Sequence, residues 1–188
     1  NAFQGKIAEQ AVYNKFKQLN LNTYNKLSPL DLDVYSRGSW DDTDITCGKT
    51  KLSIKSTAFF GNLLLLETKD WTTDARYKPN IAVEGKECAY DYYALVRIKP
   101  DGKKVMKANK LFYSKDVNKT KLLNILGGES WLYDIAGFCT HDDLKYIIQN
   151  EFILPQGSKL NNTTTMDAEN YYIQSGNLKD LDKLIKLL

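Results

Sequence analysis

The chain has 188 residues, of which 43% are hydrophobic and 26% charged, and a formal net charge of +3. This length fits one domain with a substantial core, and no apolar run of about 18 residues is present to cross a membrane. The three cysteines, Cys47, Cys88 and Cys139, lack C-x-x-C spacing, which favours reduced thiols and a cytoplasmic protein over disulfides or a zinc site. His141 is the single histidine, which disfavours a histidine metal cluster or a serine–histidine triad.

The first half of the chain predicts a helix followed by short strands. Apolar residues recur at helical spacing over Phe3–Leu19, which predicts a helix there. Alternating or continuous apolar runs bounded by turn residues predict four strands. These strands are expected around Leu30–Tyr35, at Thr43–Cys47 and Lys51–Ala58 as a hairpin, and at Leu63–Leu66, ending at Glu67.

The second half predicts two further strands and two helices. Tyr90–Ile98 alternates in a way that places Tyr92, Ala94, Val96 and Ile98 on one face of a strand. The turn at Pro100-Asp-Gly102 is expected to start another strand at Lys104–Ala108. Thr140 is expected to cap a helix over Leu144–Ile148, with acids in its first turn. An amphipathic helix is expected over Asn177–Leu188.

These elements predict one α/β domain over residues 1–188, with a mixed central β-sheet flanked by helices. We expect its core to span about residues 1–110. Residues 111–188 are expected to form a mixed helical and loop extension that packs on this core.

Basic residues gather between Arg97 and Lys121, where nine stand against only Asp101 and Asp116. Such a stretch can supply contacts to the phosphates of a nucleic acid. Within it, the candidate DNA-binding residues are Lys99, Lys103, Lys104 and Lys107. The alternative is a lysine-rich loop and helix face that is simply solvated.

The run from Asp44 to Lys55 is the stretch of the sequence that is most informative about function. Folded as a hairpin, it returns Lys55 to the neighbourhood of Asp44. A carboxylate and an ammonium held together suit metal-assisted phosphodiester hydrolysis, in which the carboxylate fixes Mg²⁺ and the lysine orients or activates a water.

Three segments together resemble the PD-(D/E)XK nuclease superfamily: Gly5-Lys-Ile-Ala-Glu9, Asp44-Ile45, and Leu52-Ser-Ile-Lys-Ser-Thr57. That superfamily includes many type II restriction endonucleases, archaeal-type Holliday junction resolvases and repair nucleases. The resemblance covers about the first 70 residues, with Tyr90–Ile98 as a further core strand. It implies a restriction-endonuclease-like αβββαβ core.

The resemblance also implies the site residues. Asp44 would bind the metal together with the Ile54 backbone carbonyl, and Lys55 would be the motif lysine. Glu9 would be the first-helix acid that reaches the metal directly or through water. Ser53 stands where the family usually has an acid and is a candidate partner of a water or metal ligand. The missing acid would then come from Glu67, twelve positions after Lys55, or from Glu9.

The implied function is a Mg²⁺-dependent DNA endonuclease, with Mn²⁺ as an acceptable substitute, that is most similar to type II restriction enzymes. A Holliday junction resolvase or repair nuclease is the alternative with the same chemistry. A non-catalytic DNA-binding or assembly protein on a degenerate nuclease fold is the alternative of another class, supported by Ser53. The expected partners are double-stranded or branched DNA and a second copy of the chain, since a double-strand cutter of this size needs two active sites.

Each site residue also has an ordinary structural interpretation. Asp44 can be a turn acid, for which the neighbouring Asp41 and Asp42 are possible replacements, and Lys55 an exposed strand lysine. Glu9 can be a solvated helix charge, and Glu67 a residue at which a strand surfaces.

Overall fold

The computed structural model describes residues 2–31, 44–79, 89–160 and 164–188. Its helices are α1 (Ala2–Leu19), α2 (Leu21–Tyr24), α4 (Gly102–Ala108), α5 (Lys119–Gly127), α6 (His141–Gln149) and α7 (Leu181–Leu187), with short 3-10 turns η1 (Thr68–Asp70) and η2 (Ser175–Asn177). Its strands are β1 (Ile45–Cys47), β2 (Thr50–Ala58), β3 (Leu63–Glu67), β4 (Tyr92–Lys99), β5 (Leu132–Thr140), β6 (Ile153–Leu154) and β7 (Asn170–Gln174).

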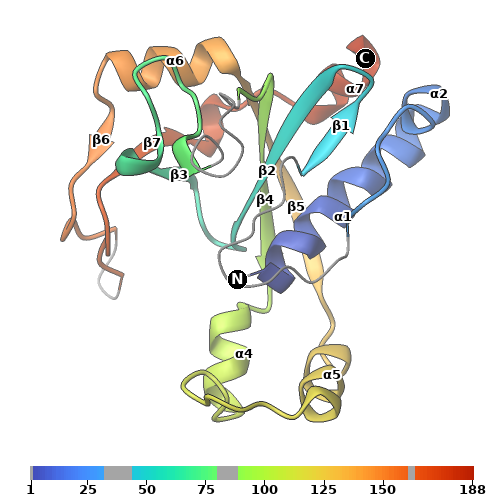
Figure 1. Cartoon of the computed structure of the whole chain (residues 1–188), viewed down its shortest axis with the longest axis vertical. Coiled ribbons are helices and arrows are strands. Elements are labelled where there is room, and N and C mark those ends of the chain that lie inside the picture. Colours follow the sequence, from blue (N-terminus) through green and yellow to red (C-terminus); the bar gives the residue numbers. More distant parts are fainter. Residues whose placement is uncertain (1, 32–43, 80–88, 161–163) are drawn as a thin grey trace.

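Within the described residues, the central sheet has four strands in the order β1-β2-β4-β5. β1 and β2 form an antiparallel hairpin, β2 pairs with β4 in parallel, and β4 pairs with β5 antiparallel. A second, antiparallel sheet has the order β3-β7-β6. The protein is therefore an α/β protein with a mixed central sheet flanked by helices, as expected from its sequence (Figure 1).

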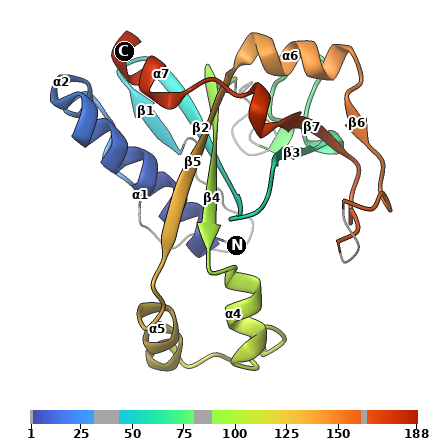
Figure 2. The ribbon, with the colours of Figure 1, turned by 180° about the vertical axis from the view of Figure 1, so that it is seen from behind.

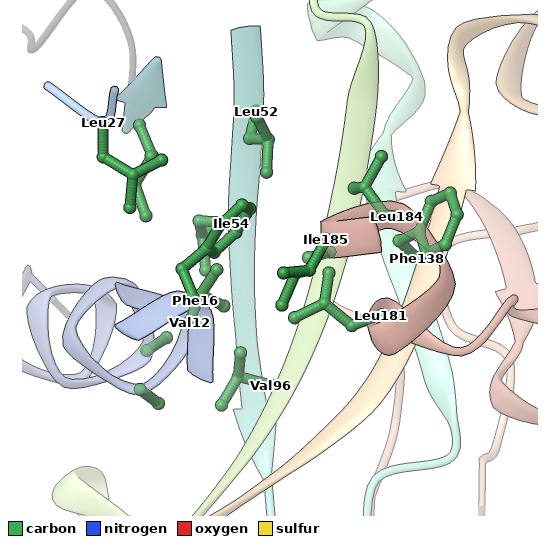
Figure 3. Packing of buried hydrophobic residues seen from close by; sticks show 14 of the residues in the cluster. Val12, Phe16, Leu27, Leu52, Ile54, Val96, Phe138, Leu181, Leu184 and Ile185 are labelled. Atoms are coloured by element: carbon green, nitrogen blue, oxygen red, sulfur yellow. The ribbon is translucent and has the colours of Figure 1, made fainter. Parts of the chain in front are cut away.

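Each face of the central sheet packs against a different layer. On one face, Val12 and Phe16 of α1 and Leu184 of α7 meet Ile54 of β2 and Val96 of β4 (Figure 3). On the other face, β3, β7 and α6 cover the sheet through an apolar cluster. That cluster includes Leu64, Leu66, Tyr93, Leu95, Leu144, Ile148 and Ile173. The side chains of a strand alternate between its two faces, so Lys55 and its neighbour Ile54 point toward different layers.

Most of the predicted elements are confirmed, among them the first helix, the hairpin and the strands at Leu63–Glu67 and Tyr92–Lys99. The cap is confirmed as well, because the Thr140 side chain accepts from the Asp143 N–H at 3.1 Å and Asp143 accepts in return from the Thr140 N–H at 2.8 Å. The strand expected near Leu30–Tyr35 lies mostly outside the described residues. The C-terminal helix begins at Leu181, later than expected.

The strand predicted at Lys104–Ala108 is wrong, because this segment belongs to helix α4. Asp101 caps the helix by accepting a hydrogen bond from the Lys103 N–H at 2.9 Å. The lysines, methionine and alanine that follow favour helix, and the preceding turn at Pro100–Gly102 does not outweigh that preference together with a cap.

The segment after residue 110, expected as an extension, contributes strands to both sheets. β5 completes the central sheet beside β4, and β7 pairs with β3. α4 and α5 instead extend beyond one end of the central sheet (Figures 1 and 2). Among the described helices, none is long and apolar enough to span a membrane.

Candidate active site

Asp44 lies at an edge of the central sheet, immediately before β1. Its Oδ2 accepts a hydrogen bond from the backbone N–H of Ile54 at 2.5 Å. The pairing of β1 with β2 ends at Ile45 and Leu52, so Asp44 takes up the next backbone donor along β2. Because the N–H and C=O of one strand residue point to the same edge, the Ile54 carbonyl also points to the side of Asp44.

Lys55 faces the layer formed by the second sheet. It is aligned with Leu95 of β4, which is buried in the cluster under β3 and β7. The Lys55 Nζ lies 5.5 Å from the centre of the Tyr77 ring. Tyr77 is held in turn by Trp71, through a backbone bridge and a ring contact at 5.2 Å. The segment after β3 therefore folds over the Lys55 side of the sheet.

Three carboxylates act on the same tyrosine. Burial is the largest cause that raises the pKa of Tyr77, followed by the negative charges of Asp70, Asp44 and Glu67. Since Lys55 lies over the ring of that tyrosine, the fold brings Asp44, Lys55 and Glu67 into one neighbourhood. Asp44 and Lys55 come from the two sides of one hairpin, and Glu67 comes from the end of β3.

Asp70 is the member of this group that the sequence did not single out. Burial and the neighbouring Glu67 raise the pKa of Asp70, while Lys69, Lys55 and Lys78 act to lower it. Glu67 itself forms an ion pair with Lys69 at 2.6 Å. The signal in the sequence was the acid three residues after Glu67, since residues at this spacing share one face of a helical turn such as η1.

Glu9 and Ser53 stand in different surroundings. Glu9 is only 5% exposed and forms an ion pair with Lys6 at 2.9 Å. It lies on α1, which covers the opposite face of the sheet from the one that carries Lys55. Ser53 is on the Lys55 face and is 1% exposed. Within the described part of the chain, its hydroxyl has no hydrogen-bond partner.

The oxygen donors near Lys55 suit a magnesium ion. In the described residues, no three histidine, cysteine or acidic side chains converge into a ready-made metal site. Mg²⁺, however, is usually held by one or two carboxylates and completes its shell with water and substrate phosphates. Asp44, the Ile54 carbonyl and either Glu67 or Asp70 could contribute oxygen ligands of this kind.

The predicted DNA-binding lysines lie at the far end of the same sheet. Lys99 ends β4, and its Nζ lies 4.4 Å from the centre of the Phe59 ring. Lys103, Lys104 and Lys107 are exposed on α4.

A cavity of about 530 Å³ lies elsewhere, between α6 and β7. Its lining includes Asp143, Tyr146 and Tyr172 but neither Asp44 nor Lys55. Asp143 is engaged there by Lys179 at 2.5 Å and by the cap of α6. Because this acid has a structural role, the group around Tyr77 is the stronger candidate for chemistry.

Comparison with known proteins gives no further assignment, since no family model, curated protein or solved structure matches the chain.

Proposed function

We propose that this protein is a metal-dependent DNA endonuclease of the restriction-endonuclease-like type. The observation that carries the proposal is that Lys55 lies over the ring of Tyr77, on which the negative charges of Asp44 and Glu67 also act. A sheet-edge carboxylate beside a strand lysine is the minimal equipment for metal-assisted hydrolysis of a phosphodiester. We also propose a cytoplasmic location, as inferred from the cysteines. Cys47 and Cys139 are both buried free thiols.

The residues have separate tasks in the proposed reaction. Asp44 and the Ile54 carbonyl would hold Mg²⁺, or Mn²⁺ in its place, and Glu67 or Asp70 would supply a second carboxylate. Such an ion, when bound, would lower the pKa of a coordinated water and offset charge that develops on the phosphate. Lys55 orients this water, while the ring of Tyr77 restricts the positions open to its ammonium group.

The topology supports a restriction-endonuclease-like core only in part. Helix α1, the β1–β2 hairpin and the parallel pairing of β2 with β4 agree with the order expected for an αβββαβ core. β3 differs from the strand expected in such a core, because it belongs to the second sheet, where it pairs with β7. The strand expected near Leu30–Tyr35 lies mostly outside the described residues.

The test is cleavage of supercoiled plasmid in Mg²⁺ by the wild type and two site variants. Asp44→Asn and Lys55→Ala are each expected to lower the cleavage rate by about 100-fold or more, as loss of one electrostatic group in an active site does. Asp91→Asn is the matched control for Asp44, because Asp91 also accepts a β2 backbone N–H, from Lys51 at 2.8 Å. Equal loss in Asp44→Asn and Asp91→Asn would contradict the assignment, since it would mark a general effect on β2.

The second acid can be identified with the same assay. Glu67→Gln and Asp70→Asn are each combined with a titration of Mg²⁺. Substitution of the residue that binds the ion should raise the Mg²⁺ concentration needed for half-maximal cleavage. Substitution of the other residue should leave that concentration unchanged. Glu9→Gln is included because the resemblance gives Glu9 the same role, although α1 covers the opposite face of the sheet.

The substrate and assembly are tested alongside. Discrete duplex fragments support a restriction-type enzyme, and cleavage of four-way junctions alone supports a resolvase. Binding without cleavage, unaffected by Lys55→Ala, would leave only a non-catalytic DNA-binding protein on this fold. A restriction-type enzyme is also expected to sediment as a homodimer.

A further inference from the structure

The segment from residue 102 to residue 131, here called the α4–α5 lobe, concentrates the positive charge of the chain. It holds seven lysines against Asp116 and Glu129, a net charge of +5, whereas the whole chain carries only +3. All seven lysines are exposed: Lys103, Lys104, Lys107, Lys110, Lys115, Lys119 and Lys121. None of them forms an ion pair with a described carboxylate. This lobe is therefore a strongly positive surface, of the kind that attracts polyanions.

Exposed aromatic rings accompany these lysines. Tyr113 is 84% exposed and stands edge to face with Phe112, with ring centres 4.9 Å apart. The Lys107 Nζ lies 5.1 Å from the centre of the Phe112 ring. The preceding Leu111 is buried, so it anchors the loop that presents the pair. Lys107, Phe112 and Tyr113 thus place a lysine and aromatic rings side by side on the same surface.

The end of the central sheet repeats this arrangement. Phe60 is 88% exposed and contacts Phe59 edge to face, with ring centres 5.7 Å apart. Lys99 lies over Phe59, as Lys107 lies over Phe112.

This second pair connects the lobe with the candidate active site. Because side chains of one strand alternate between its faces, Tyr93, Leu95, Arg97 and Lys99 of β4 share the face that carries Lys55. Arg97 is engaged by Asp134, with its Nε 2.7 Å from the carboxylate, whereas Lys99 is exposed. Lys99 lies four strand residues beyond the level of Lys55, or about 13 Å at ~3.3 Å per residue. A DNA strand whose phosphate contacts Lys99 would therefore reach Lys55 within a few nucleotides.

We propose that the α4–α5 lobe and the Phe59–Phe60 pair bind an unpaired stretch of DNA and lead it to the Lys55 face. The lysines contact its phosphates, and bases stack on the exposed rings of Tyr113 and Phe60. A duplex keeps the faces of its bases inside the stack, so exposed rings select unpaired bases. The binding step is independent of the proposed nuclease activity, and only the delivery to Lys55 rests on it.

The test measures binding without metal, so that cleavage plays no part. Fluorescence anisotropy of a labelled 20-nucleotide oligothymidine and of a 20-base-pair duplex is followed in EDTA with the full chain. We expect the single strand to bind more tightly than the duplex. Tyr113→Ala should weaken single-strand binding at least 5-fold, since stacking of one base on an aromatic ring contributes ~1–3 kcal/mol, and should leave duplex binding unchanged. Tyr146→Ala, which removes an exposed ring from α6, is the control.

The lysines give a second readout. The double variant Lys103→Ser/Lys104→Ser should weaken binding of both DNA forms. For the single strand, it should also make the negative slope of log K against log salt shallower by about 1.4, or ~0.7 for each lost phosphate contact. Lys183→Ser/Lys186→Ser on α7 removes two exposed lysines from another helix and should change neither quantity.

Equal affinity for duplex and single strand, or single-strand binding that Tyr113→Ala leaves intact, would overturn the inference. These outcomes are distinct from failure of the proposed function. A protein that binds single strands through Tyr113 but never cleaves DNA would refute only the nuclease. Plasmid cleavage that is lost in Lys55→Ala but unaffected by the lobe variants, without single-strand preference, would refute only the lobe.

Discussion

Ser53→Ala is expected to stabilise the protein. Ser53 is 1% exposed and its hydroxyl has no partner among the described residues. A buried hydroxyl without a hydrogen bond costs ~1–3 kcal/mol. Its removal leaves a void of roughly 15 Å³, the scale of one water probe, which at ~24 cal/mol per Å³ costs about 0.4 kcal/mol. The free energy of unfolding should therefore rise by about 1 kcal/mol, equivalent to a melting temperature about 2–4 °C higher.

The assay is urea unfolding with thermal melting as a second measurement. Ser56→Ala on the same strand, where the side chain is exposed, is the control and should stay within ~0.5 kcal/mol of wild type. A loss of 1 kcal/mol or more in Ser53→Ala would refute the reasoning, because it would mean that the hydroxyl is hydrogen-bonded in the folded protein. Plasmid cleavage adds a functional readout: activity should persist in Ser53→Ala, and its loss in a stable variant would give Ser53 a role in the site.

Three further predictions concern stability. Thr140→Ala removes the cap of α6 and should lower the free energy of unfolding by about 1 kcal/mol in urea. Gly137→Ala should lower it by more than ~2 kcal/mol, because Gly137 has φ +135° and an added Cβ would lie 2.6 Å from the Lys179 carbonyl oxygen and 2.9 Å from the Leu178 Cβ. Burial raises the pKa of the Asp143 carboxyl, but Lys179 and the hydrogen bonds with Thr140 outweigh it, so the net shift is downward. A folded-state pKa below the unfolded value of about 3.9 stabilises the protein above that pH, and this stabilisation is lost as the pH falls through the folded value. Lys179→Ala should therefore be less stable than wild type at pH 7 in urea titrations, and the difference should shrink as the pH falls below the unfolded pKa of Asp143.

Local patterns predicted the elements that meet on the α1 side of the sheet. The helical spacing of Val12 and Phe16 and the alternation of Ala94, Val96 and Ile98 each point to one buried face, and these faces meet in one cluster. Here, hydrophobic period and tertiary packing agree. The pairing of distant segments was not predictable in this way. Nothing in the sequence near Leu63–Glu67 indicates that this strand pairs with a segment about a hundred residues later.

The strand predicted at Lys104–Ala108 was wrong for a different reason. The five residues Lys-Val-Met-Lys-Ala do not alternate strictly, and their two lysines stand three positions apart, a spacing that fits a helical turn. The strand was predicted there because a tight turn precedes it. Capping by Asp101 decided the outcome, and capping is a local hydrogen bond that the hydrophobic pattern does not record.

The identity of the second acid depends on burial that no local pattern reveals. Ser53 is aligned with Tyr93 of β4 and lies beneath the layer formed by β3 and β7. A carboxylate at that position would have to give up its water almost completely, at a cost of several kcal/mol unless a cation were held against it. A serine meets this burial at far lower cost. If the chain cleaves DNA, its second acid must then come from the segment that covers the sheet. Glu67 and Asp70 lie in that segment, and both act on the tyrosine that contacts Lys55.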